Sequence, residues 1–217
     1  VLMGFLIMSF SSSAVLAGKA SERLFINAQT LFEQSLAGDD SVTGVALNQF
    51  RILSMTYRDN PLFLAYQGAC HTLMGRDAWM FWNKTSYTEE GLEMIGKALQ
   101  MLKSAHDSEK MRGVPISVET RLIAVSTFSG VPKSFNHFEK AKAVLAALFQ
   151  SSAFHETPVP MQARIYQQAA KIAQLENQRD EETKHLIKIL EIDPKGQFAK
   201  MARQRLQIGR ASCRERV

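Results

Sequence analysis

Residues 163–194 read ARIYQQAAKIAQLENQRDEETKHLIKILEIDP, which contains two helical patterns separated by a short polar turn. Apolar residues recur every three to four positions in both halves, as along one face of an α-helix; they are Ile165, Tyr166, Ala169 and Ala173, then Leu186, Ile187 and Leu190. A short turn makes neighbouring helices antiparallel. The stretch therefore predicts a helical hairpin whose apolar face needs further helices to cover it.

The same period extends from this hairpin towards both ends of the chain, and we find no convincing alternation typical of a strand. The apolar pattern predicts further helices within residues 21–36, 41–53, 61–73, 88–102, 115–128, 138–149 and 198–206. Turn-forming segments such as AGDDS, RDNP and SGVPKS separate them. We therefore expect an all-α fold of about four antiparallel hairpins and a terminal helix, stacked around one continuous core.

Stretch 163–194 resembles a tetratricopeptide (TPR) repeat when counted back from Pro194 as its closing proline. The matching signature positions are Tyr166, Ala169, Ala170, Ala173, Leu186 and Ile189. Glu182 departs from the pattern, since a small residue is expected there. FEKAKAVLAAL (138–148) and EEGLEMIGKAL (89–99) are similar to second helices of other units, but their preceding connections are longer than the repeat allows.

A second likeness covers AYQGACHTLMGRDA (65–78) and YTEEGLEMIGKAL (87–99), which resemble a group of uncharacterised bacterial TPR-like proteins. That likeness implies no activity. The TPR resemblance implies an α-α superhelix over residues 18–207, with a concave groove lined by the first helix of each pair.

The two ends of the chain carry separate expectations. Residues 1–17 carry no charge and residues 1–10 are their most apolar part, which is typical of a signal peptide cleaved before Gly18. Lys19 stands where a lipoprotein would have its cysteine. We therefore expect a bacterial periplasmic or secreted protein without a stable membrane span. Residues 208–217, IGRASCRERV, match the translation of a common sequencing adapter, and we expect them not to be native.

Composition argues against several classes of function. Without residues 208–217 the formal net charge falls from +5 to +3, which is weak support for nucleic-acid binding. Cys70 is then the sole cysteine, so no intrachain disulfide is expected. The sequence has no glycine-rich phosphate loop, no G-x-S-x-G elbow and no pair of histidines at metal-binding spacing. We therefore predict no enzyme, no metal and no cofactor.

The stretch MGRDAWMFWNKTSYTEEG, residues 74–91, holds both tryptophans, and we expect it to be a long loop between two helices. Gly75 would end the preceding helix and Thr88 would cap the next. In one interpretation, Trp79 and Trp82 form an aromatic platform while Arg76 and Lys84 bind an anionic group. In the other, the tryptophans pack over the ends of the two helices.

The favoured function is a non-catalytic interaction module that binds a protein or peptide in the concave groove. Candidate groove residues on the first helices are Tyr66, Gln67, Arg121, Gln162 and Gln167. Lysines on polar helix faces, such as Lys140 and Lys142, are either simply solvated or suit acidic peptides. The alternative is a periplasmic small-ligand-binding or transporter-associated protein, with residues 74–91 as a lid.

Overall fold

The computed structural model describes the backbone of residues 10–214 and the side chains of residues 21–207. Its longer elements are all helices, which confirms the all-α prediction. They are α1 (Phe10–Leu36), α2 (Thr43–Thr56), α3 (Pro61–Asp77), α4 (Phe81–Gln100), α6 (Ile116–Gly130), α7 (Phe138–Gln150), α9 (Val159–Leu175), α10 (Arg179–Ile192) and α11 (Ala199–Arg214).

Short elements that the apolar pattern missed lie between the long helices. They are the 3₁₀ turns η1 (Asp40–Val42) and η2 (Lys133–Phe135), the single-turn helices α5 (Ala105–Ser108) and α8 (Ser152–His155), and the strands β1 (Lys110–Met111) and β2 (Val114–Pro115). The strands pair antiparallel, with Lys110 opposite Pro115. Such elements are too short to show a period in sequence.

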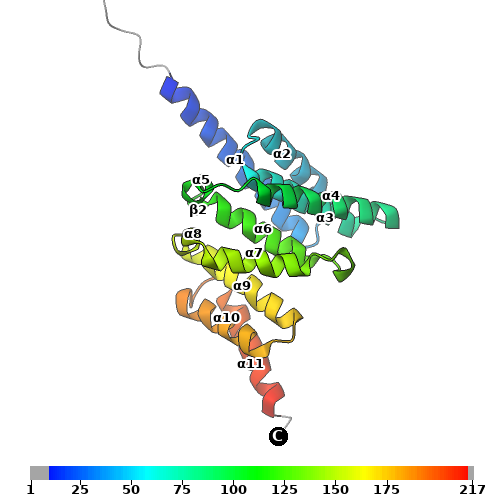
Figure 1. Ribbon diagram of the computed structural model, residues 1–217, viewed down its shortest axis with the longest axis vertical. Helices are drawn as coiled ribbons and strands as arrows, with labels where there is room; N and C mark the ends of the chain where they lie inside the picture. The colour runs from blue at the N-terminus through cyan, green and yellow to red at the C-terminus, as the bar shows by residue number, and fades with distance from the viewer. Residues whose placement is uncertain (1–9, 215–217) are drawn as a thin grey trace, which may run out of the picture.

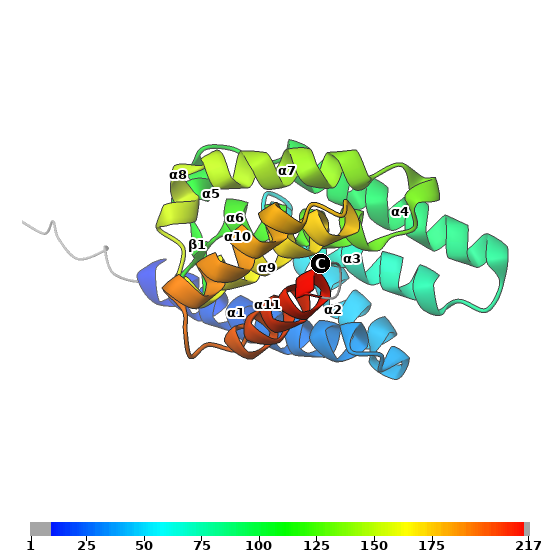
Figure 2. The same cartoon turned by 90° about the horizontal axis from the view of Figure 1, so that it is seen from below.

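The long helices follow one another along the longest axis of the molecule, from α1 at one end to α11 at the other (Figure 1). The pairs α1–α2, α3–α4, α6–α7 and α9–α10 pack as hairpins, and α3 also packs on α6. Seen from below, α4 and α7 lie on one side and α1, α2 and α11 on the opposite side, with α3, α6 and α9 between them (Figure 2). The middle helices are therefore covered on more than one face.

Stretch 74–91 is not a long loop, which corrects the prediction. Helix α3 continues to Asp77 and α4 begins at Phe81, so only residues 78–80 connect them. Gly75 lies inside α3, where a Cβ would come within 2.9 Å of the Lys84 carbonyl oxygen. Thr88 is buried in the middle of α4, and its hydroxyl donates to the same carbonyl at 2.7 Å. The glycine serves close helix packing rather than helix termination.

The predicted chain ends fall partly outside the described residues. Residues 1–9 of the predicted signal peptide and residues 215–217 of the predicted non-native tail lie outside them. Helix α1 begins at Phe10 and passes through the predicted cleavage position. Helix α11 spans Ala199–Arg214 and so continues beyond the last predicted helix, residues 198–206.

Two hydrophobic clusters form the core. The larger one extends from α1 to α9 and includes an aromatic group in which the Phe50 and Tyr66 rings stack with centroids 4.7 Å apart. The smaller cluster joins α9, α10 and α11 through Ala163, Ala170, Leu186, Ile189 and Ala202. Tyr166 packs against both. Cys70 is fully buried in the larger cluster, and burial raises the pKa of its thiol well above the ordinary value.

Candidate functional site

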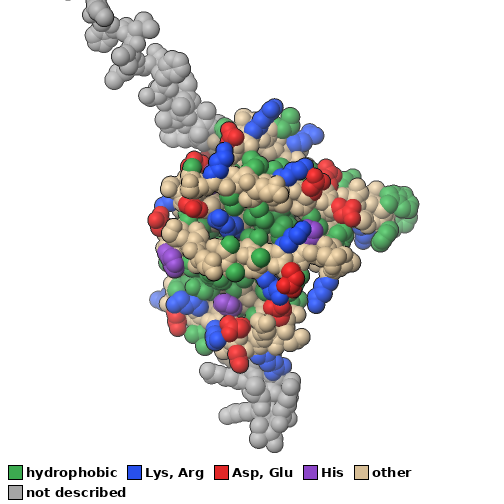
Figure 3. All heavy atoms as spheres, viewed as in Figure 1, with side chains coloured by type: hydrophobic (Ala, Val, Ile, Leu, Met, Phe, Trp, Pro, Cys, Tyr) green, Lys and Arg blue, Asp and Glu red, His purple; other side chains and the backbone are tan. Residues whose placement is uncertain are grey.

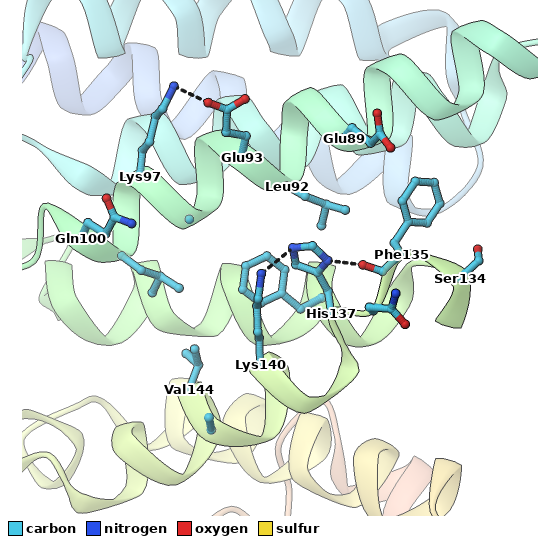
Figure 4. A pocket seen from close by; sticks show the side chains of 15 residues that line it. Glu89, Leu92, Glu93, Lys97, Gln100, Ser134, Phe135, His137, Lys140 and Val144 are labelled. Atoms are coloured by element: carbon cyan, nitrogen blue, oxygen red, sulfur yellow. Dashed lines mark hydrogen bonds and ion pairs between the residues drawn. The ribbon is translucent and has the colours of Figure 1, made fainter.

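A groove of about 870 Å³ lies between α4 and the segment formed by η2 and α7 (Figure 4). The apolar lining comes from α4, α6 and α7 and includes Leu92, Leu99, Phe128 and Val144. The polar lining includes Glu89, Glu93, Lys97 and Gln100 from α4, and Asn136, His137 and Lys140 at the start of α7. Apolar surface framed by a few polar groups is the usual composition of a binding site.

One wall of the groove is a face of α4. Lining residues Glu89, Leu92, Gly96 and Gln100 recur every three to four positions and so share that face. Gly96 has no atom within 4 Å of the place where a Cβ would stand. The missing side chain leaves open space in the middle of the wall.

The opposite wall depends on the turn that leads into α7. Asn136 ends η2 in the left-handed conformation, with φ of 56°, which asparagine tolerates better than most residues. His137 follows, and its Nδ1 lies 2.6 Å from the carbonyl oxygen of Phe135. Because a carbonyl only accepts, Nδ1 carries the hydrogen and Nε2 accepts from the Lys140 ammonium at 3.2 Å. The imidazole is thus held against the Phe128 ring, with centroids 5.0 Å apart.

Charges of both signs surround the apolar lining. On α4, Glu93 pairs with Lys97 at 2.7 Å, and the hydrogen bond from Lys97 lowers the pKa of the Glu93 carboxyl. Glu89 adds a second carboxylate on this wall, while Lys140 places an ammonium on the other (Figure 4). The groove can therefore contact apolar groups along its length and oppositely charged groups on its two walls.

The predicted groove residues Tyr66 and Gln67 are instead buried, 1% and 8% exposed, so their placement in an open groove was wrong. The Tyr66 hydroxyl donates to Glu119 Oε1 at 2.7 Å, and the Gln67 side chain accepts from the Ser54 hydroxyl at 2.6 Å. Helix α3 packs on α2, α4 and α6, which leaves little of its surface open. The observed groove opens between second helices, not first ones.

Three other predicted residues are half-buried, and none lines the groove between α4 and α7. Arg121 lies 3.8 Å from Asp107, and Gln162 donates to the Thr157 carbonyl at 2.8 Å. Gln167 accepts a hydrogen bond from Gln168 at 3.1 Å. Lys140, by contrast, was expected on a polar helix face, either simply solvated or suited to acidic peptides, and the structure places it among the residues that line the α4–α7 groove.

The residues predicted around the tryptophans do not form one anion site. Arg76 is paired with Asp77 at 2.6 Å and donates to the Ser35 carbonyl at 2.9 Å, so its guanidinium serves the fold. Trp79 is 91% exposed and Trp82 is 65% exposed, so packing over the helix ends was also wrong. Lys84 lies exposed in the first turn of α4.

Sequence reasoning missed a buried polar cluster that joins α1, α3 and α6. Glu119, 1% exposed, accepts from Tyr66 and from Arg112 Nη2 at 2.8 Å, while Arg112 Nη1 donates to Gln29 at 2.5 Å. Burial raises the pKa of the Glu119 carboxyl, and the Arg112 charge opposes that shift. Arg112 reaches the cluster from the turn between β1 and β2, where its φ is 52°. The only signal in the sequence was that Glu119 is the sole acidic residue of the α6 segment.

The family models, the curated proteins and the solved structures compared with this chain include none that matches it. Within the described residues, no helix has the length and apolar character needed to cross a bilayer. Among the side chains that the structure describes, those of residues 21–207, no group of three or more His, Cys, Asp or Glu could bind a metal ion.

Proposed function

We propose that this protein is a non-catalytic interaction module, built from TPR-like helical hairpins, that binds a peptide segment of a partner protein in the α4–α7 groove. The α-helical hairpin pairs and the repeat-like stretch 163–194 support the TPR-like part of the proposal. The groove itself, with apolar lining and charged walls, is the observation that carries the binding function. The apolar N-terminal sequence supports a site of action in the bacterial periplasm or outside the cell.

The dimensions of the groove favour an extended peptide. Its α4 wall runs from Glu89 to Gln100, which at the helical rise corresponds to about 16 Å. An extended chain advances about 3.3 Å per residue, so the wall accommodates roughly five peptide residues. Alternate side chains of such a peptide would contact the apolar lining, while a basic residue beside Glu89 and an acidic residue beside Lys140 would set its direction.

Position 96 offers a direct test because it has open space around it. Gly96→Met places a flexible side chain in the groove while adding a good helix former to α4. Gly96→Ala is the matched control, since it improves the helix by a similar amount but adds a single methyl group. Five- to eight-residue peptides selected on an array would be titrated against all three proteins by fluorescence polarisation.

We expect Gly96→Met to weaken peptide binding roughly tenfold or more, and Gly96→Ala to stay within a few-fold of the original protein. Both variants should melt no lower than the original chain. Equal peptide affinity for all three proteins would place the binding surface elsewhere. A metabolite that raises the melting temperature in the original protein but not in Gly96→Met would instead favour the small-ligand alternative.

A further inference from the structure

Four consecutive apolar residues form the end of the α3–α4 hairpin and are named here the aromatic tip: Trp79, Met80, Phe81 and Trp82. Their exposed fractions are 91%, 41%, 78% and 65%. The hairpin projects from the body of the molecule, and the tip forms a green cap at its far end (Figures 1 and 3). A contiguous apolar patch at a projecting end marks an interaction site more often than an isolated exposed side chain does.

Close packing holds the tip away from the body. Glycines Gly68 and Gly75 on α3 face Gly91 and Lys84 on α4, and a Cβ at Gly68 would lie 2.6 Å from the Gly91 carbonyl oxygen. Arg76 fastens the end of α3 to α1 through its bond to the Ser35 carbonyl. The α3–α4 hairpin is therefore closely packed, and its apolar end remains exposed to solvent.

The shape and chemistry of the tip favour a lipid surface over a protein pocket. The tip projects from the molecule (Figure 3), so a protein partner would need a cavity that matches it, whereas a bilayer adapts to any projecting apolar shape. Tryptophan is enriched where membranes meet water, because its ring is apolar and its N–H remains hydrogen-bonded. Phe81 and Met80 supply apolar area without polar groups that would need partners.

The distribution of charge sets the depth and the kind of insertion. Residues 78–83 carry no charge, and they are bounded by Asp77, which pairs with Arg76, and by Lys84. About one helical turn, roughly 5 Å, can therefore enter the bilayer before a charged group reaches it, which is the depth of interfacial insertion. Asp40 lines a small hollow with Trp79 and Met80, so the surroundings of the tip have no excess of basic residues. Attraction to anionic lipid is thus not the driving force.

We infer that the aromatic tip inserts into the interfacial layer of a phospholipid bilayer and anchors the protein there reversibly, independently of lipid charge. This anchoring does not depend on the peptide groove. Helix α4 begins within the tip and forms one wall of the groove, so anchoring would hold the groove beside the membrane surface.

The chain provides its own probe, because Trp79 and Trp82 are its only tryptophans. Vesicles of phosphatidylcholine alone, and of phosphatidylcholine with phosphatidylglycerol, would be titrated into the full chain while tryptophan emission is followed. We expect a blue shift with both vesicle types, quenching by lipids brominated near the headgroup end of the acyl chain, and no loss of binding in high salt.

The decisive comparison keeps both tryptophans and changes a neighbour. Phe81→Gln removes an exposed ring from the tip, and we expect the partition coefficient to fall roughly tenfold or more. Met55→Gln is the matched control, because Met55 is 64% exposed but lies on α2, outside the tip. We expect this variant to have the same vesicle partition coefficient as the original chain. Circular dichroism of both variants should match the original chain.

Several outcomes would overturn the inference. These are emission that no vesicle changes, equal partition of Phe81→Gln and Met55→Gln, or binding only to anionic vesicles that high salt abolishes. A blue shift that grows with protein concentration in the absence of lipid would identify a second copy of the chain as the occupant. If Gly96→Met suppressed that shift, the occupant's tip would lie in the α4–α7 groove.

Discussion

At the scale of single residues, the polar cluster around Glu119 depends on contacts between helices that the apolar period of one helix does not indicate. Tyr66 occupies an apolar-face position on α3, and Glu119 lies 53 residues away on α6. No local pattern in the sequence indicates that Tyr66 is buried or which carboxylate receives its hydroxyl. The prediction of an open groove at Tyr66 failed for this reason: the groups that bury it are distant in sequence.

Loss of the Tyr66 hydroxyl should destabilise the fold measurably. Tyr66→Phe keeps the ring stacked on Phe50 but removes a hydrogen bond to a buried carboxylate, and such bonds contribute about 1.5–3 kcal/mol. We expect the free energy of unfolding in urea to fall by that amount. Tyr87→Phe is the control, because Tyr87 is half-buried and contacts His71 through its ring, which phenylalanine retains. Equal losses in both variants would contradict a specific role for Tyr66.

His185 should make stability depend on pH. Its ring stacks on Phe149, and burial lowers its pKa below the ordinary 6.5, an effect that Glu181 partly offsets. The unfolded chain therefore takes up the proton first as pH falls. The free energy of unfolding should decline from pH 6.5 downward and level off below the folded pKa, with His71 contributing in the same direction.

His185→Gln would isolate this contribution. We expect the variant to lose less stability than the original chain when urea unfolding at pH 5 is compared with unfolding at pH 8. The raised pKa of Glu119 changes the pH dependence of stability in the opposite direction, but it does so equally in both chains. The difference between their free energies of unfolding therefore reports on His185 alone. If His185→Gln showed the same pH dependence as the original chain, the lowered pKa of His185 would not contribute to stability.

At the scale of elements, the apolar period identified the longer helices because each buries one face against its neighbours. It failed at residues 74–91, where Gly75 was interpreted as a stop and an aromatic segment as a loop. The local sequence does not show whether a glycine ends a helix or lets a neighbouring helix pack closely against it. Only the position of the neighbouring helix distinguishes the two cases. The groove was likewise hidden, because Gly96 on one wall and Asn136 on the other are far apart in sequence and only the fold brings them to the same groove.

The α3–α4 contact should respond sharply to one methyl group. In Gly68→Ala the new Cβ would lie 2.6 Å from the Gly91 carbonyl oxygen and 2.9 Å from Ile95 Cγ1, so the helices must separate. We expect a loss of about 1–3 kcal/mol, as for other overpacked sites, measured by urea unfolding. Gly44→Ala, exposed in α2 with nothing within 4 Å, should instead gain up to about 1 kcal/mol. Similar losses in both would argue against close packing.

At the scale of the whole molecule, the division of the core into two clusters predicts two levels of stability. The larger cluster joins helices α1 to α9, whereas α10 and α11 rest on a smaller one that contains three alanines. In stacked helical hairpins each unit contacts chiefly its neighbours, so a terminal unit can open while the rest stays folded. Amides of α10 and α11 should therefore exchange hydrogen faster than those of α3 and α6.

A pair of core truncations distinguishes local from global opening. Ile189 is fully buried in the smaller cluster and Leu122 is 1% exposed in the larger one, and truncation to alanine at such sites costs about 2–5 kcal/mol. In hydrogen exchange followed by mass spectrometry, Ile189→Ala should speed exchange in α10 and α11 while leaving α3 and α6 protected. Leu122→Ala should lower protection in α3 and α6 as well. If Ile189→Ala accelerated exchange equally in all these helices, the two clusters would behave as one cooperative core, and Tyr166, which packs against both, would be the residue that couples them.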